Sequence, residues 1–213
     1  MKVKLFKFIR LVIGFMFCSI GIVLTINANL GLSPWDVLFQ GISKTTGITM
    51  GNASILISAI IISLNVLFGE SVGWGTILNM LMIGKLMDVI MLNNLIPISN
   101  DFGSGVLMLL IGMILLSIGC YLYISVGLGS GARDGMMVVL QKKTGKPIKV
   151  VRGCLEIGAV IIGFLLGGTV GIGTIITSVG LGYCMQFTFN AFNFDVVGVS
   201  HRYIKEDFKY FNS

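Results

Sequence analysis

Six apolar runs dominate this chain, and each is close to the length of a membrane-crossing helix. They lie at roughly 11–26, 53–68, 74–92, 105–126, 154–166 and 172–192. A helix needs about 17–25 apolar residues to cross the ~30 Å hydrocarbon core of a bilayer. Only 11% of the residues are charged, whereas a soluble domain carries about 25%. The sequence therefore predicts an all-α polytopic membrane protein with about six transmembrane helices, surrounded by the lipid bilayer.

An internal repeat relates the two halves of the chain at a constant offset of 98 residues. The segment IGFMFCSIGIVLTI at 13–26 aligns with IGMILLSIGCYLYI at 111–124, and VGWGTI at 72–77 aligns with VGIGTI at 170–175. A repeat of this kind constrains the whole architecture. Each copy contains three apolar runs, and with an odd number of spans the second copy has to enter the membrane from the opposite side. We therefore expect two inverted three-span repeats.

The distribution of basic residues favours this inverted arrangement. Cytoplasmic loops of membrane proteins collect Lys and Arg. If the N-terminus is cytoplasmic, the expected outer segments contain a single basic residue, Lys44. Membrane topology then accounts for the net charge of +6, and no nucleic-acid partner is expected. The predicted organisation is a basic cytoplasmic N-terminus at 1–10, membrane repeats at 11–95 and 104–192, and a cytoplasmic tail at 195–213.

A polar break with a short amphipathic segment follows the first span of each copy. The two breaks read LGLSPWD at 30–36 and LGSGARD at 128–134. In the first, Ser33 is expected to cap a helix that has Pro34 at its first position, where a missing N–H costs least. We predict short helices over 34–43 and 131–143, each near ~18 Å long and too short to span. They either lie in the interface or re-enter the membrane.

The aspartates of these two motifs have two interpretations. In the first, Asp36 and Asp134 satisfy unpaired N–H groups at the helix starts. In the second, the short helices are broken helices that face one cavity, because irregular backbone at membrane depth needs protein or water around it. Transporters built from inverted repeats bind substrate at such breaks. Under this interpretation Asp36, Trp35, Arg133 and Asp134 line a shared solute site.

Glycines and two charged residues complete the candidate set. Gly31 and Gly129 precede the short helices, while Gly73, Gly75, Gly171 and Gly173 open the third span of each copy. We expect them to allow tight turns and close helix packing, although N–H groups after such glycines can also receive an anion. Lys85 and Asp88 lie three residues apart on one helical face. Ionisable residues within spans indicate function, so this pair either lines the cavity or reaches the headgroups.

These motifs together resemble those of the YczE/YyaS/YitT family of bacterial membrane proteins, over about residues 10–190. The resemblance rests on Gly-Leu-x-Pro-Trp-Asp, on Thr-Gly and on Gly-x-Gly-Thr, which return in the second copy as Arg-Asp-Gly, Thr-Gly and GIGT. The second copy departs from the pattern at Ala132, where the proline is missing. The resemblance implies a multi-pass protein of the bacterial cytoplasmic (inner) membrane, and it carries no biochemical activity with it.

Two classes of function fit these features. The first is a small secondary transporter or permease, with an unknown small solute or ion bound between the repeats. The alternative is a non-transporting membrane subunit, namely a regulatory, scaffolding or substrate-capture component of a larger complex. The candidate protein partners are a second copy of the chain, as a homodimer, or a membrane partner subunit. An enzyme is not expected, because the single histidine, His201, lies in the tail. The four cysteines also lack metal-ligand spacing, so neither a metal nor a cofactor is expected.

Overall fold

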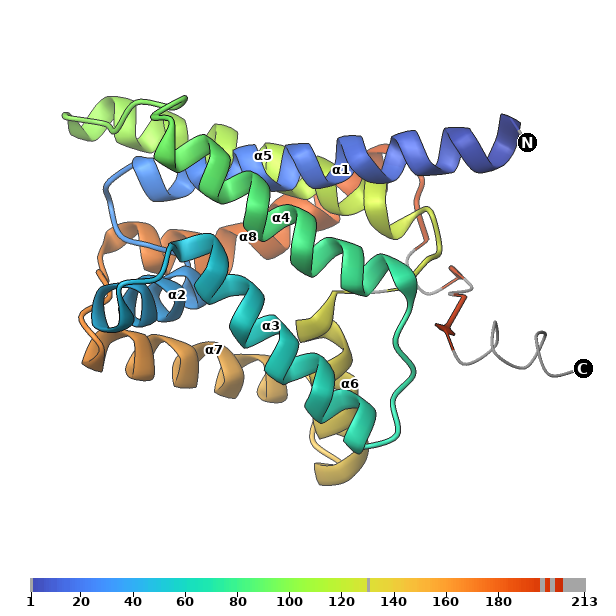
Figure 1. The fold of residues 1–213 in the computed structure, drawn as a ribbon. Helices are drawn as coiled ribbons and strands as arrows, with labels where there is room; N and C mark the ends of the chain where they lie inside the picture. Colours follow the sequence, from blue (N-terminus) through green and yellow to red (C-terminus); the bar gives the residue numbers. More distant parts are fainter. Residues whose placement is uncertain (1, 130, 196–197, 200–201, 205–213) are drawn as a thin grey trace, which may run out of the picture.

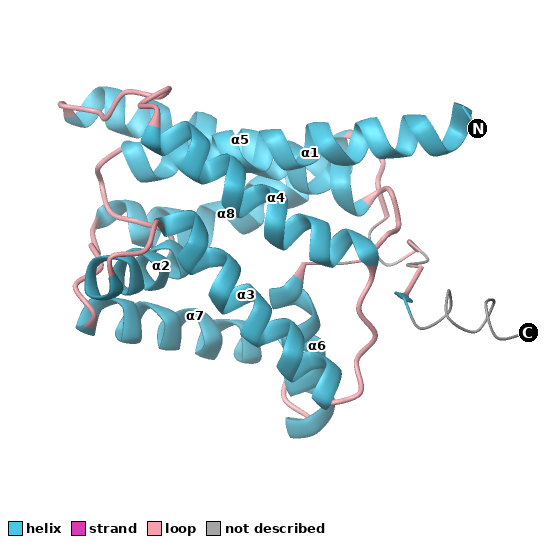
Figure 2. Ribbon diagram, in the orientation of Figure 1, coloured by secondary structure: helices cyan, strands magenta, loops and turns pink. Residues whose placement is uncertain are grey.

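The computed structural model describes residues 2–129, 131–195, 198–199 and 202–204. Most of the expected tail at 195–213, including His201, lies outside this set. The described residues form eight α-helices and no strand (Figure 2). The helices are α1 (Lys2–Asn27), α2 (Pro34–Thr46), α3 (Met50–Leu67), α4 (Trp74–Leu92), α5 (Phe102–Ile124), α6 (Ala132–Thr144), α7 (Ile148–Leu165) and α8 (Ile172–Ala191). The predicted all-helical class is confirmed.

Five of these helices are long and apolar enough to cross a membrane, namely α1 over Leu5–Asn27, α3, α4, α5 and α8. The predicted count was six. The missing one corresponds to α7, which has 18 residues but carries Lys149, Arg152 and Glu156. Its apolar run at 154–166 is shorter than the ~17 residues that a span needs. By length and composition, therefore, five of the described helices are candidate membrane spans.

The helix boundaries repeat at the offset seen in the sequence. Helices α2, α3 and α4 begin at Pro34, Met50 and Trp74, and α6, α7 and α8 begin 98 residues later. Helices α1, α4, α5 and α8 run along the same direction of the molecule, with the short helices α2 and α6 towards opposite ends (Figure 1). Each short helix packs against the other half: α2 against α7, and α6 against α3.

Four glycines allow α1 and α5 to pack closely. A Cβ atom at Gly21 would lie 2.7 Å from the carbonyl oxygen of Gly112, and one at Gly14 would lie 3.1 Å from that of Gly119. Small residues at such positions let membrane helices approach each other. Because α1 and α5 are the first helices of the two halves, this contact joins the halves along their length.

Helix α2 begins at the predicted residue, α6 begins at Ala132, one residue after the predicted start, and both end slightly later than predicted. Helix α2 begins at Pro34 and reaches Thr46, beyond the expected end at 43, and α6 reaches Thr144. Each ends at a glycine in the left-handed conformation, Gly47 with φ 77° and Gly145 with φ 66°. That conformation terminates a helix at little cost only for glycine.

The two ends of the molecule contain different helix termini. The N-terminus, the end of α5, the start of α7 and the end of α8 lie at one end, here called the N-terminal end (Figure 1). There Tyr121 of α5 stacks on Phe192, just after α8, with ring centroids 4.4 Å apart. The start of α3 and the end of α4 lie at the opposite end.

Candidate functional site

The start of α2 carries a buried carboxylate that is held by its own helix cap. Ser33 is the N-cap residue in extended conformation. Its hydroxyl does not accept a backbone N–H, as the predicted cap would, but donates to Oδ2 of Asp36 at 2.5 Å. Asp36 is 4% exposed. At the start of α6 the cap residue is Gly131, which has no hydroxyl, so the two helix starts share backbone geometry but not this hydrogen bond.

Arg133 brings the two helix starts together. Its guanidinium carbon lies 4.8 Å from the centroid of the Trp35 ring and 5.3 Å from that of Phe39. A guanidinium within about 6 Å of an aromatic face is attracted by the ring quadrupole. A side chain from α6 is thus stacked on two rings of α2, although the two helices are 98 residues apart in sequence.

The glycines before and after the breaks hold the two starts in place. The N–H of Gly75 donates to the Leu128 carbonyl at 2.7 Å, and that of Gly173 donates to the Leu30 carbonyl at 2.7 Å. These two hydrogen bonds are equivalent under the 98-residue offset. They tie the segment before each short helix to the first turn of the third long helix in the other half. The N–H groups of these two glycines therefore serve the fold and are not open to an anion.

Close backbone contact explains why the remaining candidate glycines have no side chain. A Cβ atom at Gly31 would lie 2.5 Å from the amide nitrogen of Gly171, and one at Gly129 would lie 3.0 Å from the Cα of Gly73. Gly31 and Gly129 also have positive φ angles of 110° and 122°, which glycine adopts most readily. All six candidate glycines thus act in packing at the helix starts.

A cavity of about 230 Å³ lies between the two helix starts. Its lining includes Trp35, Asp36, Arg133 and Asp134, and it extends to α3, α4, α7 and α8. The lining is built almost wholly from equivalent positions: twelve pairs separated by 98 residues account for 24 of its 27 residues. Among them are Ser33 with Gly131, Ser54 with Arg152, Ser58 with Glu156, Asn79 with Thr177, and Met87 with Met185. The cavity therefore lies where the two halves meet.

Five charged side chains line this cavity in an otherwise mainly apolar and aromatic surface: Asp36, Arg133, Asp134, Arg152 and Glu156. Arg152 donates through Nε to Oε1 of Glu156 at 2.8 Å. Apolar pockets with a few converging polar groups are typical of small-molecule sites. The arrangement can hold a small polar molecule or ion between fixed charges, with rings on one side.

Lys85 and Asp88 lie outside the cavity lining and do not act as the predicted pair. The Lys85 ammonium donates to Oδ1 of Asn52 at 2.9 Å. The Asp88 carboxylate accepts from Thr49 Oγ1 at 2.6 Å and from the Gly51 N–H at 2.8 Å. Both residues therefore connect α4 to the start of α3. The three-residue spacing that suggested a pair could not reveal these partners, because they come from another helix.

Several lining residues were not among the sequence candidates. Arg152 and Glu156 lie four residues apart near the charged start of α7, while Phe39, Tyr123 and Ser54 carried no local signal. The repeat itself contained the missing signal. Asn79 and Thr177 are equivalent polar residues within apolar spans, so aligning the copies and selecting paired polar positions would have found them.

Comparison with known proteins agrees with the resemblance seen in the motifs. A family model described as a family of unknown function, DUF6198, matches residues 5–190. The uncharacterized membrane protein YczE of Bacillus subtilis is 32% identical over 179 residues, which cover 82% of this chain and 81% of that protein. An uncharacterized protein of Haemophilus influenzae is 37% identical over 172 residues, covering 81% of this chain and 78% of the relative.

A further relative, the uncharacterized protein YyaS of Bacillus subtilis, is 28% identical over 180 residues, covering 80% of this chain and 86% of the relative. No solved structure matches the chain. Five apolar helices of spanning length agree with the description of YczE as a membrane protein. Because the family model covers nearly all of the described helices, this helical membrane protein belongs to the DUF6198 family, and YczE and YyaS are its relatives.

Proposed function

We propose that this protein is a small secondary transporter or permease, and not an enzyme, with its solute site in the cavity between α2 and α6. The observation that carries the proposal is the cavity lining, in which equivalent residues of both halves surround Asp36, Arg133 and Asp134. Broken or short helices that meet at a repeat interface are a recurring design of transporter binding sites.

Reciprocal contacts support an inverted-topology repeat as part of this proposal. Gly31 contacts Gly171, and Gly129 contacts Gly73. Because Gly31 is equivalent to Gly129 and Gly73 to Gly171, the two contacts join the same two repeat positions in the two possible directions. A contact pattern of this kind is what a two-fold relationship produces. Under it α7 is a sixth span equivalent to α3, and its charged residues face the cavity and the polar interface. The basic residues around α6 and α7 then make the N-terminal end cytoplasmic, in the cytoplasmic membrane of a bacterium.

The chemistry of the lining assigns roles to the charged groups. Arg133 is always protonated in water and its fork of N–H donors suits a carboxylate or phosphate. The starts of α2 and α6 add the positive ends of two helix dipoles. Asp36 and Asp134 provide the opposite charge, for a cation, a proton or the amine of a zwitterion. A cavity of about 230 Å³ limits the solute to a small molecule or ion.

A thermal-unfolding screen tests the proposal. The purified protein would be heated with a panel of small carboxylates, phosphates, amines, amino acids and inorganic ions, beside Asp36→Asn/Asp134→Asn. A ligand at a hundred times its dissociation constant stabilises the folded state by ~2.7 kcal/mol. Asp101→Asn is the matched control, because Asp101 lies in the exposed turn before α5. We expect a stabilising compound that is lost in the double variant and kept in the control.

Transport is then measured with the compound found in the screen. A permease moves it into vesicles that contain this protein alone, and the double variant does not. If the compound binds but never crosses the vesicle membrane, the protein is a capture or regulatory subunit. In that case it should co-purify with a stoichiometric membrane partner. A compound that stabilises the double variant as well as the wild type would overturn the site itself.

A further inference from the structure

The two halves differ at one equivalent helix pair. Helix α3 packs against α4, but α7 and α8, which are described over their full lengths, are not among the closely packed pairs. In the first half, a Cβ atom at Gly84 of α4 would lie 2.6 Å from Cγ1 of Ile55 on α3. The equivalent residues in the second half are Gly182 and Gly153, and a Cβ atom at either would meet nothing within 4 Å. The contact present in one half is thus open in the other.

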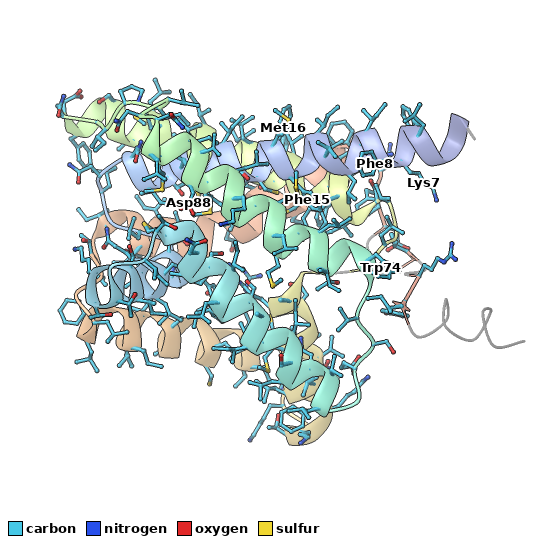
Figure 3. All side chains as sticks on the ribbon, in the orientation of Figure 1. Lys7, Phe8, Phe15, Met16, Trp74 and Asp88 are labelled. Atoms are coloured by element: carbon cyan, nitrogen blue, oxygen red, sulfur yellow. The ribbon has the colours of Figure 1, made fainter. Side chains whose placement is uncertain are left out.

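The closed pair is fastened by Asp88. This residue is 8% exposed, and its carboxylate accepts the Thr49 hydroxyl at 2.6 Å and the Gly51 N–H at 2.8 Å. It caps the start of α3 from a position on α4 (Figure 3). A Cβ atom at Gly51 would collide with the Gly84 carbonyl and lie 2.5 Å from Cγ of Asp88. Glycine at 51 is therefore needed for the carboxylate to reach the backbone.

The second half has no equivalent fastening. The positions that correspond to Thr49, Gly51 and Asp88 hold Pro147, Lys149 and Gln186. Proline has neither a hydroxyl nor an N–H, and all three residues are exposed, whereas Gly51 and Asp88 are buried. The sequence therefore stabilises the α3–α4 contact and not the α7–α8 contact.

The open pair is continuous with the cavity. Leu155 and Glu156 of α7 and Leu181 and Met185 of α8 all belong to the cavity lining. The start of α7 and the end of α8 lie at the N-terminal end of the molecule, and the start of α3 and the end of α4 lie at the opposite end (Figure 1). The fastened and the open pairs are thus at opposite ends of one cavity.

We propose that these two helix pairs are the alternate entrances to the cavity, and that Asp88 is the latch of the closed one. This proposal rests on the proposed function, and it assigns the structure to a state open only at the N-terminal end. When the entrance at the N-terminal end closes, α7 and α8 approach each other until Gly153 contacts Gly182, as Ile55 of α3 contacts Gly84 of α4 in this structure. Opening the other requires Asp88 to release Thr49 and Gly51. Two entrances related by the repeat and never open together are what solute exchange across a membrane requires.

Labelling of a single cysteine tests the proposal without any solute. The four native cysteines are replaced by Ala, and Leu181→Cys places one thiol in the cavity lining on α8. A membrane-impermeant maleimide is applied to vesicles of each orientation, and a tag on the N-terminus identifies the side. We expect labelling from the N-terminal side only. Adding Asp88→Ala should raise the labelling rate from the opposite side about tenfold or more, since a hydrogen bond to a charged group is worth roughly that factor.

Two further variants separate a latch from a general loss of folding. Gln186→Ala removes the side chain equivalent to Asp88 and should leave the labelling one-sided. Asp88→Asn keeps one acceptor oxygen, which can take the Gly51 N–H, but replaces the other by an NH2 group that only donates, so it should give a smaller rise than Asp88→Ala. Thermal unfolding of each variant in the same vesicles identifies any that fail to fold, and Asp88→Asn then replaces Asp88→Ala.

The proposal is overturned if the Leu181→Cys thiol reacts equally from both sides or from neither. It is also overturned if folded Asp88 variants keep the labelling of the wild type. If the labelling is one-sided and Asp88→Ala adds labelling from the opposite side, but the protein moves no solute, the result would instead count against the proposed function alone.

Discussion

Arg133 and Trp35 occupy equivalent positions in the two halves of the chain and contact each other, with the guanidinium carbon 4.8 Å from the ring centroid. In a two-fold arrangement, a residue contacts its own equivalent only beside the axis. Cys18 and Leu116 are a second such pair, since the Cys18 thiol lies 3.9 Å from the Leu116 carbonyl oxygen, and their separation in sequence is also 98. All four residues belong to the cavity lining, so the proposed two-fold relation between the halves would be centred on the cavity. A change at this centre acts on both halves at once.

Replacing Arg133 by lysine should destabilise the protein although the positive charge is kept. Lysine has no planar group to stack on Trp35 and Phe39. A desolvated cation–π contact is worth about 2 kcal/mol, which corresponds to roughly 4–8 °C in the unfolding midpoint of a chain of this size. The midpoint is measured by thermal unfolding in detergent. Lys146→Arg, in the exposed turn before α7, is the control and should not change it. An unchanged midpoint for Arg133→Lys would mean that the stacking contributes no stability.

Removing the hydroxyl of Ser33 should also destabilise the protein. Ser33→Ala takes the 2.5 Å donor from the buried Asp36 carboxylate. A buried charged group that loses a hydrogen-bond partner costs about 1–3 kcal/mol. Ser63→Ala is the matched control, because Ser63 is exposed and donates only to the Ala59 carbonyl of its own helix. Equal unfolding midpoints for the two variants would show that Asp36 does not depend on Ser33.

Local signals in the sequence located the short helices and most of the spans. Pro34 can begin a helix but cannot continue one, and Gly47 and Gly145 can end one, so these boundaries depend on residues close in sequence. The five apolar helices follow from length and composition in the same way. Helix α7 was harder to predict, because its apolar run is short and its first turns are charged.

The contacts between helices could not be read from spacing alone. Arg152 and Glu156 lie four residues apart on α7 and form an ion pair at 2.8 Å, as side chains at this helical spacing can. The same reasoning failed for Lys85 and Asp88, because the start of α3 offers Asp88 a hydroxyl and an N–H that are distant in sequence. The repeat was the one non-local signal available, and the cavity lining follows its offset closely.

The turn before α5 should show a simple dependence of stability on pH. Hydrogen bonds from the Ser104 hydroxyl at 2.6 Å and from the Ser104 N–H at 2.9 Å lower the pKa of Asp101 below its usual value. A carboxylate with a lowered folded pKa stabilises the folded state above the unfolded pKa of ~3.9, and this contribution is lost as the pH falls through the folded pKa.

Asp101→Ala should therefore lower the unfolding midpoint at neutral pH and converge with the wild type in acid. Ser104→Ala is the informative companion, because it removes the largest cause of the shift and leaves the carboxylate. Its difference from the wild type should follow the same pH course at smaller size. A difference between Asp101→Ala and wild type that stays constant from neutral to acid pH would contradict this account.

Two glycines of α7 should respond differently to the same substitution. A Cβ atom at Gly163 would lie 2.5 Å from the Leu38 amide nitrogen and from the Val37 carbonyl carbon, whereas one at Gly158 would meet nothing within 4 Å. Overpacking of a closely packed site costs about 1–3 kcal/mol, while alanine in place of glycine in a free helical position gains about 0.5–1 kcal/mol. Gly163→Ala should therefore lower the thermal midpoint and Gly158→Ala raise it or leave it unchanged.

The variants Gly163→Ala and Gly158→Ala also test whether the α2–α7 contact holds the two halves together. The α2–α7 contact connects the short helix of one half to a long helix of the other. If Gly163→Ala separates them, the cavity lining around Trp35 and Phe39 should loosen as well, and the intrinsic fluorescence of Trp35 should shift to longer wavelength in a variant with Trp74→Phe. Gly158→Ala should leave that emission where it is. If the Gly163→Ala protein is as stable as the wild type and its emission is unchanged, the close α2–α7 contact is not needed to hold α2 in place.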